Sequence, residues 1–115
     1  MLKTGQQHLE SLRDGRRVYI GDELVEDVTT HPAFANAAKS FAMIYDRKRD
    51  PENIDVMAYE DEDGELSSSW FLKAKTRDDL RRRRETHRRV AEWTCGLIGR
   101  SPDHVASFVT GLLWK

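Results

Sequence analysis

The segment from Gly99 to His104, with the sequence Gly-Arg-Ser-Pro-Asp-His, joins the end of one helix to the start of another and contains side chains suited to chemistry. Gly99 is a helix stop, and the Ser-Pro-Asp of residues 101–103 supplies an N-cap, a first-turn proline and a first-turn acid. The N–H groups at a helix start lack partners and carry a partial positive charge. Because Arg100 adds a permanent charge directly before them, the segment is suited to bind a phosphate, a carboxylate or a phenolate.

His104 falls in the first turn of the helix that this segment begins. Its imidazole can accept or donate a proton near neutral pH, so it could act on a group bound beside Arg100. Ser-Pro-Asp is also an ordinary helix start with no further role. From these residues alone, both interpretations stay open.

Seven arginines and a histidine decorate the helix that precedes this segment. A basic helix can bind phosphates, but four consecutive arginines point in all directions and do not form one stripe. Glutamates and aspartates stand at pairing distances along the same helix. We therefore expect a solvated face or an interdomain ion-pair network rather than a nucleic-acid interface. The residues are Arg77, Arg81, Arg82, Arg83, Arg84, His87, Arg88 and Arg89.

Three other candidate sites have simpler explanations. The acidic run Glu60–Glu65 lacks the spaced ligands of a calcium loop, so we interpret it as a solvated turn. The four histidines do not have metal-ligand spacing, and no metal site is predicted. Cys95 lies beside Ala91 and Ile98 in the expected long helix and is interpreted as a buried, unreactive thiol.

The elements that position these residues can be read from apolar spacing and capping signals. Thr4 and Thr76 are N-cap residues, and Gly15 and Gly99 are helix stops. The alternation of apolar and polar residues predicts two short hairpins. We expect helices over residues 4–14 and 76–97, a helix that opens at residues 29–32 and ends at 50–53, a final helix from residue 101, and hairpins pairing 18–20 with 24–25 and 54–58 with 66–72.

The last eleven residues form the most apolar stretch of the chain. Phe108, Val109, Leu112, Leu113 and Trp114 stand here without a polar tail. An uncovered apolar end favours association, so we expect either docking on a partner subunit or a chain shortened from a longer protein.

Composition restricts the class of protein. A length of 115 residues suits one small domain, and a net charge of −1 gives no global attraction for nucleic acid or membranes. A single cysteine excludes an internal disulfide, and the start has no secretory signal. We expect a cytoplasmic α+β protein, mainly helical with two short hairpins.

The segment Gly99–His104, preceded by Thr76–Leu80 and Arg82–Glu85, resembles the N-terminal region of the 4-hydroxyphenylacetate 3-monooxygenase family. These proteins are the oxygenase components of two-component flavin-dependent monooxygenases. The similarity extends in order along essentially the whole chain. Further similar stretches are residues 2–5, 9–16 and 25–34.

The resemblance implies a phenol hydroxylase that inserts oxygen ortho to the hydroxyl group, using reduced FAD from a separate reductase. It implies that residues 1–115 are one N-terminal domain of an acyl-CoA-dehydrogenase-like flavin monooxygenase, a homo-oligomer, commonly a tetramer. The β-rich middle domain, the C-terminal helical bundle and the flavin-binding segments are expected beyond Lys115, and the fragment alone is expected to be inactive. The candidate catalytic residues are Arg100 and His104, and the candidate substrate-binding residues are Arg100, Ser101, Pro102, Asp103 and His104.

One departure leaves the substrate open. Phenol hydroxylases of this family carry a tyrosine where this chain has His104. A dehydratase branch that acts on a hydroxyacyl thioester shares the N-terminal pattern and is an alternative. A second alternative is a non-catalytic binding or assembly module that docks through its apolar C-terminal helix.

Overall fold

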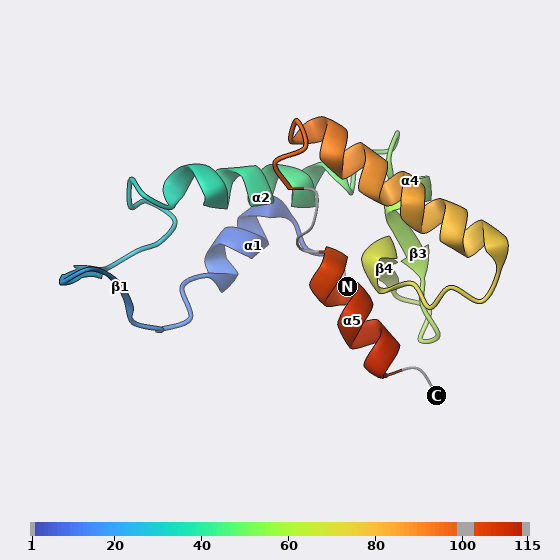
Figure 1. Cartoon of the computed structure of the whole chain (residues 1–115), viewed down its shortest axis with the longest axis horizontal. Helices are drawn as coiled ribbons and strands as arrows, with labels where there is room; N and C mark the ends of the chain where they lie inside the picture. The colour runs from blue at the N-terminus through green and yellow to red at the C-terminus, as the bar shows by residue number, and fades with distance from the viewer. Residues whose placement is uncertain (1, 99–102, 114–115) are drawn as a thin grey trace. The chain divides into compact units, whose positions relative to one another are not determined.

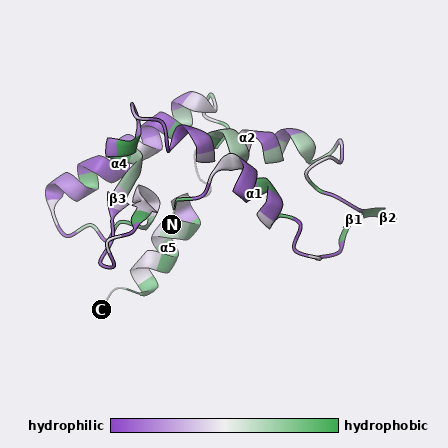
Figure 2. Ribbon diagram, turned by 180° about the vertical axis from the view of Figure 1, so that it is seen from behind, coloured by the Kyte–Doolittle hydropathy of each residue, from purple (hydrophilic) through white to green (hydrophobic). Residues whose placement is uncertain are grey.

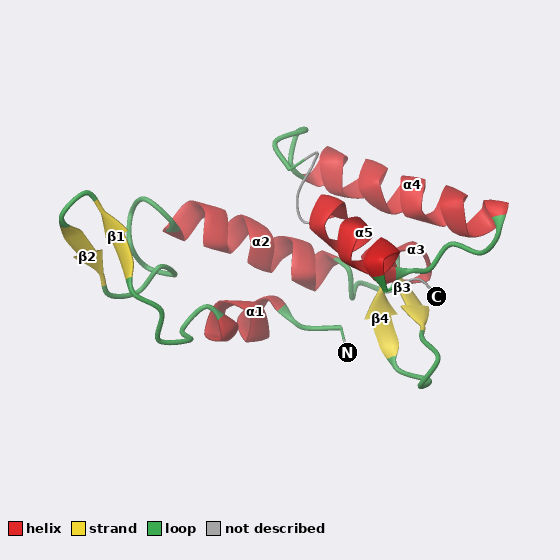
Figure 3. Cartoon of the chain, turned by 60° about the horizontal axis from the view of Figure 1, so that its bottom comes forward, coloured by secondary structure: helices red, strands yellow, loops and turns green. Residues whose placement is uncertain are grey.

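The computed structural model describes residues 2–98 and 103–113, which form helices and two small antiparallel strand pairs (Figures 1 and 3). The predicted fold class, α+β and mainly helical with two short hairpins, is confirmed. The described residues divide into an amino-terminal unit, residues 3–47, and a carboxy-terminal unit made by the others. The elements are α1 (Gly5–Ser11), β1 (Val18–Ile20), β2 (Glu23–Val25), α2 (Ala35–Arg47), α3 (Ile54–Met57), β3 (Ala58–Glu60), β4 (Leu66–Ser68), the 3₁₀ helix η1 (Ser69–Phe71), α4 (Arg77–Trp93) and α5 (Asp103–Leu112).

Helix α1 begins at the predicted cap and packs closely on α2. The Thr4 hydroxyl accepts the backbone N–H of Gln7 at 3.1 Å, and the Gln7 side chain accepts the N–H of Thr4 at 2.9 Å. The Gly5 N–H donates to Asp46 Oδ1 at 2.7 Å. A Cβ at Gly5 would lie 2.5 Å from the Ala42 carbonyl oxygen, so only glycine permits this approach of α1 to α2.

The first hairpin also forms as predicted. Gly21, with φ +57°, makes the turn, and Val18 pairs with Val25 in antiparallel register. Val25 is buried, whereas Tyr19 and Leu24 are exposed. Helix α2 starts at Ala35, later than expected, because residues 28–34 form turns; the N–H of Ala35 still bonds the His31 carbonyl at 2.8 Å.

The prediction of a strand over residues 54–58 is wrong for its first four residues. Ile54 and Met57 donate backbone hydrogen bonds to the carbonyls of Asp50 and Asn53 at 3.0 and 2.9 Å, which makes one helical turn, α3. Strand β3 begins only at Ala58 and pairs with β4. The returning strand is also shorter than expected, because η1 replaces it after Ser68.

Helix α4 has the predicted start but an earlier end. Thr76 and Asp79 form a capping box, and the last helical residue is Trp93 rather than Leu97. The chain leaves the helix through Cys95 at φ +51° and Gly96 at φ +79°, and the Gly96 N–H bonds the Ala91 carbonyl at 2.8 Å. This turn ends the helix before Gly99.

The predicted burial along α4 is partly wrong. Cys95 is an exposed free thiol on the turn, which contradicts the interpretation as a buried one. Val90 on α4 and Thr94 directly after it are buried, but Leu80 and Leu97 are exposed. Thr86 is fully buried, and its hydroxyl bonds the Val56 carbonyl.

Helix α5 packs on η1 within the carboxy-terminal unit. Figure 2 contrasts the largely hydrophilic residues of α4 with the more hydrophobic residues of α5. None of the helices formed by residues 2–98 and 103–113 is both long and apolar enough to cross a membrane.

Candidate functional site

Part of the predicted substrate site lies outside the described residues. This applies to Gly99, Arg100, Ser101 and Pro102, so their proposed contacts stay predictions. Asp103 is the first residue of α5, and His104 follows it in the same helix with an exposed side chain. The structure therefore describes the helix that would carry the site and one of its two candidate catalytic residues.

Two side chains fix α5 on the carboxy-terminal unit. Ala106 and Thr110 are 4% and 7% exposed, and they mark the face of the helix that packs inward. On α4, Arg83 donates a hydrogen bond to the hydroxyl of Ser107. His104 is outside this packed face, so its imidazole remains accessible.

The carbonyl oxygen of Val56 links α4 to η1, the element on which α5 packs. It accepts the Ser69 hydroxyl at 2.6 Å and the Thr86 hydroxyl at 3.0 Å. Both hydroxyl-bearing residues are fully buried. Because two elements bond to one carbonyl, the platform on which α5 packs is fixed by polar as well as apolar contacts.

A buried lysine was not found by sequence reasoning. Lys48, 1% exposed, follows α2, and its Nζ lies 2.9 Å from the centroid of the Trp70 ring and 3.3 Å from the Ser68 hydroxyl. Burial lowers the pKa of this amine to about 6. The Nε1 of Trp70 is itself buried and has no hydrogen-bond partner within the part of the chain that the structure describes.

The arginines of α4 behave largely as an exposed ion-pair face. Arg88 pairs with both Glu85 and Glu92, and Arg81 bonds Asp78 at 2.7 Å. The hydrogen bonds from Arg88 lower the pKa of Glu85 to about 2. These contacts support the interpretation as a solvated, ion-paired face.

The acidic run forms the tip of the second hairpin, as predicted. Asp61 Oδ1 accepts the backbone N–H groups of Asp63 and Glu65 at 3.2 and 2.9 Å, and its Oδ2 accepts the Ser67 hydroxyl at 2.7 Å. These bonds lower the pKa of Asp61, with the Ser67 bond as the largest cause. The side chain of Asp61 therefore closes the turn. Within residues 2–98 and 103–113, no cluster of metal-ligating side chains occurs.

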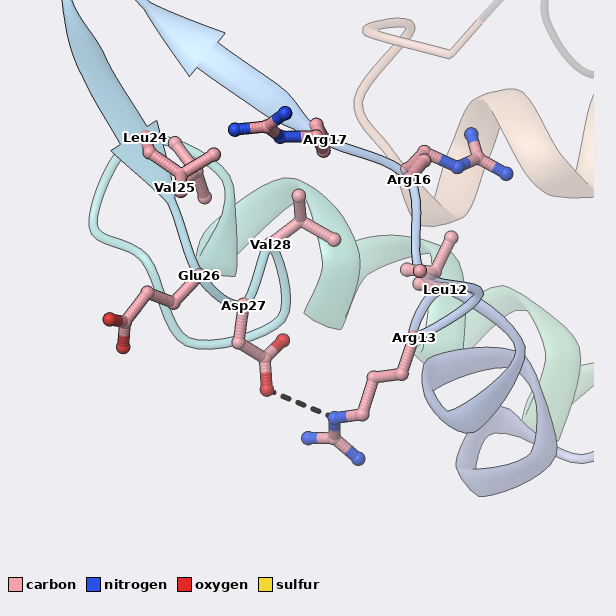
Figure 4. A pocket seen from close by; sticks show the side chains of 10 residues that line it. Leu12, Arg13, Arg16, Arg17, Leu24, Val25, Glu26, Asp27 and Val28 are labelled. Atoms are coloured by element: carbon pink, nitrogen blue, oxygen red, sulfur yellow. Dashed lines mark hydrogen bonds and ion pairs between the residues drawn. The ribbon is translucent and has the colours of Figure 1, made fainter.

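A surface cleft lies in the amino-terminal unit, between the end of α1 and the first hairpin (Figure 4). Arg13 donates to Asp27 across it at 2.9 Å, and Arg16 pairs with Asp14 beside it. Hydrogen bonds from Thr29, and then from Arg13, lower the pKa of Asp27 to about 2. The lining contains none of the predicted site residues, and the Arg13–Asp27 pair joins the end of α1 to the residues that follow β2.

Solved structures share this arrangement of elements. The oxygenase component of 4-hydroxyphenylacetate 3-monooxygenase, complexed with FAD and 4-hydroxyphenylacetate, matches with a TM-score of 0.87 and 36% identity over 94% of this chain and 23% of that chain. An archaeal 4-hydroxybutyryl-CoA dehydratase from N. maritimus matches with a TM-score of 0.68 and 21% identity over 80% of this chain and 18% of that chain, which supports the fold alone. The fold is thus that of the N-terminal region of acyl-CoA-dehydrogenase-like proteins.

The family follows from the sequence match. Residues 4–115 match the family model described as "4-hydroxyphenylacetate 3-hydroxylase N terminal", and the chain belongs to this family. The oxygenase component of 4-hydroxyphenylacetate 3-monooxygenase from Escherichia coli is 44% identical over 110 residues, covering 91% of this chain and 21% of that protein. The oxygenase component of a 4-nitrophenol monooxygenase from Rhodococcus opacus is 53% identical over 83 residues, covering 71% of this chain and 16% of that protein.

The predicted family is confirmed. The chain spans about a fifth of the length of the curated relatives that it matches.

Proposed function

We propose that this chain supplies the N-terminal part of the oxygenase component of a two-component, flavin-dependent monooxygenase that hydroxylates a phenol ortho to its hydroxyl group. The observation that carries the proposal is the family match over residues 4–115, which includes the whole Gly99–His104 segment. The relatives named above act on 4-hydroxyphenylacetate and 4-nitrophenol, both of which are phenols.

Arg100 and His104 bind the phenolic oxygen in this proposal. A guanidinium and the positive end of a helix favour the phenolate over the neutral phenol, and the phenolate is the more electron-rich ring. His104, accessible on the first turn of α5, donates or accepts a hydrogen bond at the same oxygen. The sequence Ser-Pro-Asp of residues 101–103 has the residue types that begin a helix, and α5 itself begins at Asp103.

In this proposal, O2 and reduced FAD supply the oxygen-transfer chemistry, and a separate reductase delivers the reduced FAD. A relative of this chain has been solved in complex with FAD. We assign none of the described residues to the flavin, so the roles proposed for this chain concern the substrate alone. A homo-oligomer, a tetramer in the complete enzyme, and a cytoplasmic location belong to the same proposal.

The alternatives receive less support. Several relatives at 36–44% identity over nine tenths or more of the chain are named monooxygenases, whereas the dehydratase matches at 21% and supports only the fold. The exposed apolar residues of α5 are consistent with a docking module, but they are equally expected where a longer enzyme covers this helix.

A chimera tests the proposal. The corresponding N-terminal fifth of the Escherichia coli oxygenase component is replaced by this chain, and the product is supplied with reduced FAD, oxygen and either 4-hydroxyphenylacetate or 4-nitrophenol. We expect a catechol product from at least one of the two phenols. The matched control is the oxygenase component lacking its N-terminal fifth. A chimera that assembles and binds FAD but yields no catechol from any phenol would contradict the proposal.

A further inference from the structure

Helix α5 presents His104 and Phe108 on the side opposite its packed face. Ala106 and Thr110 are the buried residues, 4% and 7% exposed. At 3.6 residues per turn, Phe108 is rotated about 200° from Ala106, and His104 about 160°. The two side chains therefore lie next to each other, one turn apart, on the helix face opposite Ala106 and Thr110.

Phe108 is 63% exposed, which is unusual for an aromatic side chain with no polar atom. Side chains on a helix lean toward its N-terminus, so the ring of Phe108 covers the surface over the turn that carries His104. The imidazole of His104 and the apolar ring of Phe108 thus lie side by side, and the Cβ atoms of the two residues are about 5–6 Å apart.

This pair matches the chemistry of a phenol. Aromatic rings pack with their centroids about 4.5–7 Å apart, which is the spacing between neighbouring positions on this helix face. A phenol whose oxygen is held at His104 brings its ring over Phe108. We propose that Phe108 forms the apolar wall against which the aromatic ring of the substrate packs; this rests on the function proposed above.

Leu112 supplies a matched comparison on the same face. It is 72% exposed and lies one further turn along α5, about 12 Å along the axis from His104. A single-ring substrate held at His104 does not reach it. Leu112 therefore lies beyond the reach of the substrate, whereas Phe108 lies within it.

Binding measurements on the chimera without flavin separate these roles. Equilibrium dialysis compares 4-hydroxyphenylacetate with phenylacetate, which lacks the hydroxyl group. We expect Phe108→Ala to weaken binding of both ligands by roughly 3- to 10-fold, the loss of one aromatic contact. We expect Phe108→Leu to lose less affinity for both ligands than Phe108→Ala does. We expect Leu112→Ala to change both affinities less than twofold. His104→Ala, in contrast, removes the preference for the hydroxylated ligand.

The outcomes distinguish this proposal from the proposed function. A chimera that makes catechol, but in which Phe108→Ala and Leu112→Ala weaken binding equally, shows that Phe108 contacts polypeptide and overturns its role alone. A folded chimera that binds no phenol overturns both. Because Phe108→Leu keeps an apolar side chain of similar size, its affinities give the answer even where Phe108→Ala does not fold.

Discussion

Replacing Lys48 by methionine should stabilise the chain, and by an amount that depends on pH. The amine is 1% exposed, and burial lowers its pKa from 10.5 to about 6. At about 1.36 kcal/mol for each pKa unit, the cost of burying the charged form approaches about 6 kcal/mol. The face of Trp70, 2.9 Å from Nζ, attracts only the charged form, so it does not reduce the cost of removing the proton from the amine at neutral pH. Methionine keeps the length of the side chain without a group that must lose its proton.

The direction in which stability changes with pH follows from proton linkage. Between pH 6 and 10.5 the unfolded chain binds the lysine proton and the folded chain does not, so wild-type stability rises with pH across this window. Below pH 6 the free-energy cost of burying Lys48 is at its full value, and above pH 10.5 this cost vanishes. We therefore expect the free energy of unfolding of Lys48→Met to exceed that of wild type by up to about 5 kcal/mol at pH 7, and the difference to narrow by up to about 1.4 kcal/mol for each pH unit above 7.

Urea unfolding of both proteins at pH 6, 7.5 and 9, followed by tryptophan fluorescence, measures the difference. Other titrating groups are common to the two proteins and cancel in the comparison. Parallel stability profiles for wild type and Lys48→Met, with no narrowing toward pH 9, would show that Lys48 keeps its charge in the folded chain and would refute the reasoning.

Two further substitutions test local contacts. Gly5→Ala should destabilise the chain by about 1–3 kcal/mol in urea unfolding, because its Cβ would lie 2.5 Å from the Ala42 carbonyl oxygen; Ser11→Ala on the same helix is the control, and equal effects would show that α1 does not approach α2 so closely. Thr76→Ala should cost about 1 kcal/mol by removing the hydroxyl that accepts the Asp79 N–H at 3.1 Å, whereas Thr76→Ser should restore the stability; a loss that serine does not recover would contradict the cap.

Local signals explain where sequence reasoning succeeded. The capping boxes at Thr4 and Thr76 depend on residues three apart, so they can be recognised without knowing the fold. The first hairpin follows from Gly21, which adopts the positive φ that its turn requires. The family motif at Gly99–His104 was recognised on the same kind of short-range pattern.

The errors arose where a short-range pattern is ambiguous or where tertiary contacts decide the outcome. Ile54–Met57 alternates as a strand does, but four residues are too few to separate this period from one helical turn. The stop residue Gly99 predicts that α4 ends near Leu97, but Cys95 and Gly96 turn the chain first, and the helix ends at Trp93. The burial of Lys48 could not be predicted, because a lysine enters the interior only when neighbours such as Trp70 surround it.

The most direct test of the proposed site is the rate of phenol hydroxylation by the chimera with and without the Arg100 guanidinium. We expect Arg100→Ala to reduce kcat by roughly 10²–10³-fold, as for loss of one charge-stabilising group, and Arg100→Lys to recover part of the rate. Arg81→Ala, which removes an exposed arginine paired with Asp78 on α4, is the control and should leave the rate unchanged. An Arg100→Ala chimera that forms catechol as fast as the parent chimera would contradict the account.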